Sequence, residues 1–150
     1  MAKNPPEGTQ RVIPYLNYAD VPAAIDFLCA AFGFERRIVL PMPDGRVGHA
    51  ELALGNNVLM LASVFEEMGH KTPAQLGAHH GAVMCYVHDV DSHHDRALAA
   101  GATITQGLED KFYGDRMYAC VDPEGHHWHF GMHVRDVSQA EMIEAMKQSE

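Results

Sequence analysis

A weak internal repeat is the feature of this chain that most limits its possible folds. Sliding the sequence along itself gives one informative register, at an offset of 69 residues, which is the separation of Gly45 and Gly114. At this offset the run 15–21, which ends in Asp-Val, lies on the run 84–90, which also ends in Asp-Val. Few residues are identical, so the repeat is one of pattern, and it predicts two copies of one supersecondary unit.

Each half has the pattern of one strand, one helix and three further strands. In the first half Asp20 suits a helix N-cap and Gly33 a helix end. In the second half Asp89 or Asp91 opens a helix that runs to Gly101. Turn residues divide the remainder, and we expect strands at residues 12–18, 35–40, 46–54, 57–62, 82–88, 103–106, 115–121 and 126–132.

The predicted fold class is α+β, a single domain of two βαβββ modules that form a cupped mixed sheet. A chain of 150 residues suits one domain. The modules cover about residues 11–63 and 81–133, with 64–80 as the connection. A short C-terminal helix follows over about 138–148, because Ser138 and Glu141 have capping-box spacing.

Four motifs resemble a known superfamily. They are Phe32-Gly33-Phe34-Glu35 after the first helix, Asp122-Pro123-Glu124-Gly125-His126 before the last strand, the run 48–52 and the run 113–116. With the two modules they resemble the vicinal oxygen chelate superfamily of glyoxalases, bleomycin-resistance proteins and extradiol dioxygenases, and its bleomycin-resistance-like branch in particular. The resemblance implies the fold and a homodimer. It does not select among the lyases, isomerases, dioxygenases and drug-binding proteins that share this fold.

The resemblance also implies where a metal would be held. Metal-using members place a His, Glu or Gln ligand on the first and last strand of each module, which here gives Ile13, Met60, Ala82 and His129. Only His129 can ligate, whereas a catalytic divalent site takes about three protein ligands. We therefore expect no metal cofactor. A relocated site built from His49, Glu51, His127 and His129 is the alternative.

Strand alternation predicts which side chains share the concave face with those positions. Leu59, Leu61, Trp128 and Phe130 should face the helices. The ligand-binding wall should then contain Tyr15, Met60, Met84, His127 and His129, a mixture of apolar and polar groups suited to a small molecule.

His49 and Glu51 lie on the same predicted face and are the candidate catalytic pair, with Glu51 as base and His49 as donor or proton shuttle. The alternative is a buried pair whose members satisfy each other's hydrogen bonds. The offset adds Arg116 and Tyr118 to the ligand-binding wall. Arg116 is either an anchor for an anionic group or a surface residue paired with a nearby aspartate. The pair His93-His94 is expected on a solvated helix surface.

Charge and composition restrict the partners. The chain has 11 Lys and Arg against 20 Asp and Glu, a net charge of −9, which disfavours nucleic acids and anionic membranes. No apolar run approaches the roughly 20 residues of a membrane helix, and we expect a cytoplasmic protein. Three cysteines without CxxC spacing argue against a disulfide framework and a structural zinc site.

Two functions stay open at this point. The first is a metal-free small-molecule-binding protein, whose ligand is aromatic or cationic. The second is a lyase, isomerase or dioxygenase of the same superfamily that uses relocated metal ligands or acid–base catalysis by Glu51 and His49.

Overall fold

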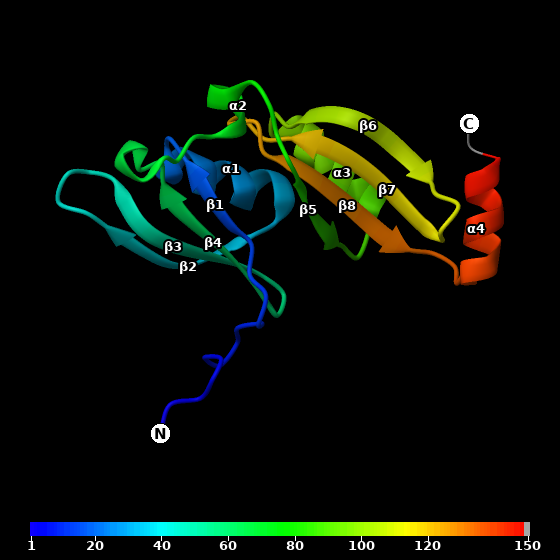
Figure 1. Cartoon of the computed structure of the whole chain (residues 1–150), viewed down its shortest axis with the longest axis horizontal. Coiled ribbons are helices and arrows are strands. Elements are labelled where there is room, and N and C mark those ends of the chain that lie inside the picture. The colour runs from blue at the N-terminus through cyan, green and yellow to red at the C-terminus, as the bar shows by residue number, and fades with distance from the viewer. Residues whose placement is uncertain (149–150) are drawn as a thin grey trace.

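The computed structural model describes residues 1–148 and contains two βαβββ modules (Figure 1). The first consists of β1 (Tyr15–Tyr18), α1 (Val21–Phe32), β2 (Glu35–Pro41), β3 (Val47–Leu54) and β4 (Asn57–Ser63). The second consists of β5 (Ala82–Tyr86), α3 (Val90–Ala99), β6 (Thr103–Asp110), β7 (Asp115–Val121) and β8 (His127–His133). The connection holds a short 3-10 turn, η1 (Glu66–Met68), and α2 (Pro73–Leu76), and the chain continues into α4 (Gln139–Lys147).

The strands form two mixed four-stranded sheets, in the orders β1-β4-β3-β2 and β5-β8-β7-β6. The outer pairs β1–β4 and β5–β8 are parallel, and the other neighbours are antiparallel. The predicted α+β fold of paired modules with a C-terminal helix is thereby confirmed. Within residues 1–148 no strand pairing joins the two sheets, so each keeps its own edges.

Local signals explain where the two long helices begin and end. The Asp20 side chain accepts a hydrogen bond from the Ala23 amide at 3.1 Å, and α1 ends at Gly33, whose positive φ of 82° suits glycine. Asp89, rather than Asp91, caps α3 through the Ser92 amide. The two capping residues are the aspartates of the Asp-Val pairs that defined the repeat.

Two strand boundaries differ from the prediction by three or more residues. β1 begins at Tyr15 rather than residue 12, directly after Pro14, which has no amide hydrogen to donate to a sheet. β6 extends to Asp110 rather than 106, because a register shift between Gln106 and Glu109 allows pairing to continue past Gly107. The connection is partly helical. None of the described helices is long and apolar enough to cross a bilayer, and the cellular location stays a prediction.

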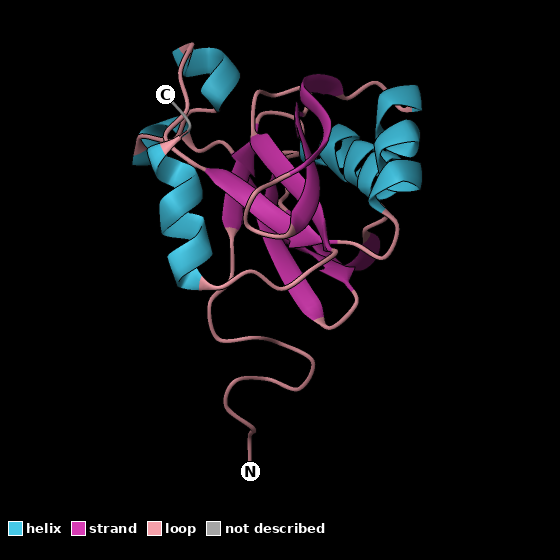
Figure 2. Cartoon of the chain, turned by 90° about the vertical axis from the view of Figure 1, so that its right-hand side faces the viewer, coloured by secondary structure: helices cyan, strands magenta, loops and turns pink. Residues whose placement is uncertain are grey.

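Aromatic side chains at the end of α1 pack the modules together. The Phe32 ring lies 5.2 Å from Trp128 and 4.6 Å from Phe130, and Phe34 lies 5.8 Å from Trp128. Trp128 and Phe130 are fully buried, as the strand alternation predicts. Helices α1 and α3 pack against each other, and α4 lies on the other side of the strands (Figure 2). One core therefore spans both modules.

Asp122, in the turn between β7 and β8, adds a polar connection between the modules. Its carboxylate accepts hydrogen bonds from the Tyr18 hydroxyl at 2.7 Å and the Trp128 indole at 3.1 Å. It also accepts the backbone amides of Glu124 and His126, both at 3.0 Å. Four donors around one buried carboxylate fix the end of β1 to the second module.

His93 is not the solvated residue expected from the sequence. Its Nε2 lies 3.0 Å from the Phe32 carbonyl oxygen, which can only accept, and its Nδ1 lies 2.6 Å from the Tyr118 hydroxyl. The ring is therefore a neutral tautomer that donates to α1 and accepts from β7. A period-3.6 pattern could not reveal this, because Phe32 lies in the other module and Tyr118 on a distant strand of the same module.

The His93 environment predicts acid sensitivity. Burial is the largest cause that lowers the pKa of His93. The folded-state pKa is then below the unfolded value near 6.5, so protonation favours unfolding and stability is lost as the pH falls below about 6.5. We expect the His93→Gln protein, whose amide keeps one donor and one acceptor, to lose less stability between about pH 7.5 and pH 5.5. Urea unfolding at each pH measures this.

The comparison must be made as a difference between two proteins, because His133 acts in the opposite direction. Hydrogen bonds with Asp136 and Asp115 raise the pKa of His133, so its contribution is present at low pH and is lost as the pH rises. His133 is the same in both proteins and cancels. Parallel pH profiles for wild type and His93→Gln would contradict the assignment.

Candidate functional site

One candidate surface is the concave face of the first sheet. Tyr15 on β1 and Glu51 on β3 are the lateral neighbours of Met60 on β4. His49 lies two residues before Glu51, on the same face. Met60 is half-buried, whereas Leu61 beside it is fully buried against the helices. These four side chains share one face of the sheet, and their role stays a prediction.

Hydrogen bonds connect these polar side chains in a row. The Tyr15 hydroxyl lies 2.7 Å from His49 Nδ1, and His49 Nε2 lies 2.9 Å from Glu51 Oε2. The other carboxylate oxygen lies 3.7 Å from the Arg37 guanidinium, which also donates to the carbonyls of Glu7 and Gly8. Burial, and then the Glu51 charge, raise the pKa of Tyr15, so the phenol keeps its proton. His49 and Glu51 do satisfy each other's hydrogen bonds, which was the alternative to a catalytic role. The hydrogen-bonded row, however, continues beyond this pair to Tyr15, which is exposed.

The second candidate surface is the concave face of the second sheet. Met84 on β5 and Ala119 on β7 are the lateral neighbours of His129 on β8. The His127 ring stacks on His79 with 3.4 Å between ring centroids. Burial, and then the nearby His79 and His129, lower the pKa of His127, which favours the neutral form of His127. His79 lies in the connecting segment, where no strand or helix periodicity predicts the direction of its side chain.

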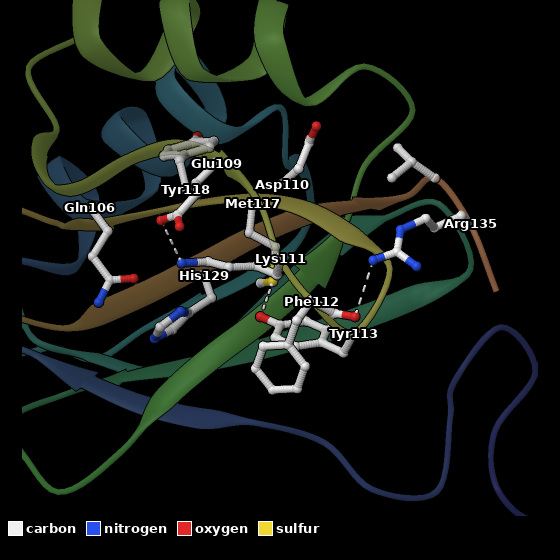
Figure 3. A pocket seen from close by; sticks show the side chains of 11 residues that line it. Gln106, Glu109, Asp110, Lys111, Phe112, Tyr113, Met117, Tyr118, His129 and Arg135 are labelled. Atoms are coloured by element: carbon white, nitrogen blue, oxygen red, sulfur yellow. Dashed lines mark hydrogen bonds and ion pairs between the residues drawn. The ribbon is translucent and has the colours of Figure 1, made fainter. Parts of the chain in front are cut away.

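Gly131 lets two methionine side chains pack over the middle of this face. A Cβ added there would lie 3.1 Å from Met84 Cε and 3.1 Å from Met117 Cγ, and Gly131 itself is buried. The Tyr113 hydroxyl lies 2.9 Å from the Met117 sulfur. Beside them is a pocket of about 670 Å³ that His129, Met117, Tyr113 and Phe112 help to line (Figure 3). This volume is in the range of small-molecule sites.

The predicted placement of Arg116 and Tyr118 in this wall is wrong. Tyr118 is 1% exposed and its hydroxyl bonds to His93, on the helix side of the sheet, although its residue also borders the pocket. Arg116 forms ion pairs with Asp91 at 2.8 Å and Asp110 at 3.2 Å. For Arg116 the alternative of an aspartate-paired residue is therefore the one that agrees with the structure.

A one-residue slip in the repeat explains the error. Glu51 pairs with Met60 on the first sheet, whereas the residue paired with His129 on the second is Ala119 rather than Cys120. The β3–β4 hairpin closes where Leu54 faces Asn57, but the β7–β8 hairpin has a longer turn. Because side chains alternate along a strand, a slip of one residue moves each side chain to the other face. Met117, which sequence reasoning left out, takes the position of His49.

The residues present do not fit a metal in the superfamily's usual position. Ile13, Met60 and Ala82 supply no oxygen or nitrogen side-chain donor, which leaves His129 alone. In the described part of the chain no three His, Cys, Asp or Glu side chains are grouped so that they could hold an ion. The relocated set is divided, with His49 and Glu51 on the first sheet and His127 and His129 on the second.

Comparisons with known proteins agree with this architecture. Residues 11–130 match the model of the Glyoxalase/Bleomycin resistance protein/Dioxygenase superfamily. "Uncharacterized protein Rv0887c" of Mycobacterium tuberculosis is 40% identical over 136 residues, which cover 89% of this chain and 80% of that protein. The crystal structure of TioX from Micromonospora sp. ML1 is 34% identical, with a TM-score of 0.66 over 83% of this chain and 99% of that one.

Another similar structure, of lower sequence identity, belongs to a protein whose function is stated. TnmS3 from Streptomyces sp. CB03234, described as an antibiotic binding protein, is 21% identical, with a TM-score of 0.63 over 82% of this chain and 95% of that one. At this identity the likeness concerns the fold.

Proposed function

The chain belongs to the glyoxalase/bleomycin resistance protein/dioxygenase superfamily, and from this premise we propose that it is a small-molecule-binding protein that needs no metal to hold its ligand. The observation that carries the proposal is the second sheet's concave face. There Met84 and Met117 cover Gly131 next to a pocket of about 670 Å³, and their thioethers offer apolar contact to a flat ligand. TnmS3 is an example of antibiotic binding on this fold.

The surface favours an aromatic ligand. Thioethers are polarisable, adapt their shape and contact aromatic rings favourably, each contact contributing about 0.3–1.5 kcal/mol. Phe112 and Tyr113 border the same pocket, and His129 offers one polar group to fix orientation. The net charge of −9 favours the approach of a cation. A planar aromatic compound with a positive charge therefore suits this face best.

We further propose that the working form is a homodimer. β1 and β5 are edge strands, and the concave faces beside them carry apolar side chains that are substantially exposed: Tyr15 at 49%, Met84 at 41% and Tyr86 at 60%. Edge strands with apolar neighbours are favourable places for another chain to pair. A second copy whose β1 lay beside β5 would join the polar face of one subunit to the methionine face of the other. Sedimentation analysis tests this directly.

A metal-free enzyme is the second candidate, and it is favoured by one observation. The row from Tyr15 through His49 to Glu51 has the geometry of a proton relay. A metal-dependent lyase or dioxygenase has no comparable support, because the donors are not grouped.

Equilibrium binding to untagged, chelator-treated protein tests the proposal. We expect saturable binding of members of a panel of planar aromatic cations, and about tenfold weaker binding by Met117→Ala, equivalent to about 1.4 kcal/mol of lost contact. Met68→Ala is the control for loss of a methionine away from this face, since Met68 is 69% exposed on η1. Because Met117 is 7% exposed, urea unfolding of Met117→Ala separates a loss of contact from a loss of folded protein. Binding that is unchanged by Met117→Ala, or that appears only when a divalent metal is added, would contradict the proposal.

A further inference from the structure

The hydrogen-bonded row on the first sheet has a defined direction. Glu51 as a carboxylate can only accept, so His49 Nε2, at 2.9 Å, carries the hydrogen of that contact. A neutral imidazole then has its lone pair on Nδ1, and the Tyr15 hydroxyl, at 2.7 Å, donates to it. The Arg37 guanidinium on the far side of Glu51 helps to hold the carboxylate in place.

This direction leaves the lone pairs of the Tyr15 oxygen free to accept a hydrogen bond from a ligand, and the oxygen can take up a proton only as its own proton moves to His49. Tyr15 is 49% exposed, while His49 and Glu51 behind it have side chains that are 26% and 19% exposed. The group at the open end of the row is therefore the phenol, and both histidine nitrogens are already occupied. A ligand on this face meets the phenol first.

We propose that Tyr15 is the proton acceptor of a metal-free acid–base activity, in which it removes a proton from a weakly acidic C–H group of a bound ligand and passes its own proton to His49. The arrangement follows the logic of a nucleophile or base activated by a histidine that a carboxylate orients. Tyr15 and His49 are the catalytic residues, and Glu51 is a positioning residue. The activity goes beyond ligand binding but rests on the concave face being accessible to a ligand.

The proton balance of the step is complete within the chain. The ligand's C–H bond breaks, its proton forms a new O–H bond with Tyr15, and the original phenol proton moves to His49 Nδ1. The electron pair stays on the ligand, as an enolate-like anion or as a bond that expels a leaving group. The positive charge on His49 lies against Glu51, and the anion on the ligand lies beside the neutral phenol. The return of the proton along the same row resets the site.

The second module serves as an internal comparison. Its residues at the positions of Tyr15, His49 and Glu51 are Met84, Met117 and Ala119, none of which can move a proton. The relay is thus confined to one of two equivalent faces.

The test uses 5-nitrobenzisoxazole, a general probe of base catalysis. Removal of its ring C–H proton breaks the N–O bond and gives a coloured cyanophenolate, so no oxidant or second substrate is needed. We expect turnover by the chelator-treated wild type and a decrease in kcat of at least about tenfold in Tyr15→Phe and in His49→Gln, since positioned general bases contribute about 10²–10⁴-fold. Glu51→Gln should lower kcat with little change in KM. His94→Gln, which alters a histidine–carboxylate pair on α3, is the matched control.

Binding of the same probe, followed by shifts of its NMR signals, separates this proposal from the proposed function. Wild type that binds the probe but turns it over no faster than Tyr15→Phe overturns the relay and leaves the binding function standing. Absence of both turnover and binding overturns the relay as an activity of this face. Turnover retained in Tyr15→Phe but lost in His49→Gln also overturns the role of Tyr15.

Discussion

Replacing Asp122 with Ala is expected to lower the free energy of unfolding by about 3–4 kcal/mol, among the largest effects of any single substitution in this chain. The change leaves the Tyr18 hydroxyl and the Trp128 indole, both fully buried, without their acceptor. An unsatisfied buried donor costs about 1–3 kcal/mol. Two backbone amides in the β7–β8 turn lose the same partner. Urea unfolding, with the slope checked for two-state behaviour, measures the effect.

Two further variants make the result specific. Asp122→Asn keeps the size and one accepting oxygen, so it should lose about half as much stability. Asp95→Ala removes a carboxylate that is 80% exposed and paired only at the surface, and should change stability by about 0.5 kcal/mol or less. An Asp122→Ala protein as stable as Asp95→Ala would show that Asp122 does not hold the modules together.

Replacing Gly114 with Ala is expected to cost about 3 kcal/mol or more and to weaken ligand binding to the second sheet. Gly114 has a φ of 99°, and an added Cβ would lie 2.1 Å from the carbonyl oxygen of Arg135, which is backbone and cannot rotate away. The Gly114 carbonyl also accepts the amides of Val134 and Arg135. Both residues border the pocket of about 670 Å³, so a displaced segment changes the shape of the site.

Gly45→Ala is a closely matched control, because Gly45 is the counterpart of Gly114 in the first module. Its φ is 90°, but nothing lies within 4 Å of an added Cβ. Only the conformational penalty remains, about 1–2 kcal/mol. The difference between the two unfolding free energies isolates the clash with Arg135. Equal losses in both proteins would contradict this account of Gly114.

The repeat in the sequence was sufficient to predict the order of strands and helices in each module, because its landmarks carry local physical meaning. Asp20 and Asp89 cap helices, and Gly45 and Gly114 have positive φ, whatever packs around them. Strand alternation then assigned Leu61 and its neighbours to the core. These inferences depend only on residues near one another in the sequence, which is why they hold.

The candidate site was predicted less completely, because its geometry depends on hairpin lengths and on contacts between distant segments. Because the β7–β8 turn is longer, Arg116 and Tyr118 lie on the opposite face from the one predicted. No residue type in the sequence indicates this shift of register. Arg37 reaches Glu51 at a bulge in β2. The hydrogen-bond partners of His93 lie at the end of α1 and on β7. Each of these contacts arises only after the sheets have formed.

The most direct test of metal-free ligand binding uses the methionine methyl groups as NMR probes, in chelator-treated protein whose metal content has been checked by elemental analysis. When a planar aromatic cation from the panel is added, we expect the methyl signals of Met84 and Met117, which pack over Gly131, to shift, and the signal of Met68 on η1 to stay unchanged. Shifts that appear only after a divalent metal is restored, or that leave Met84 and Met117 unchanged while the ligand binds, would contradict it.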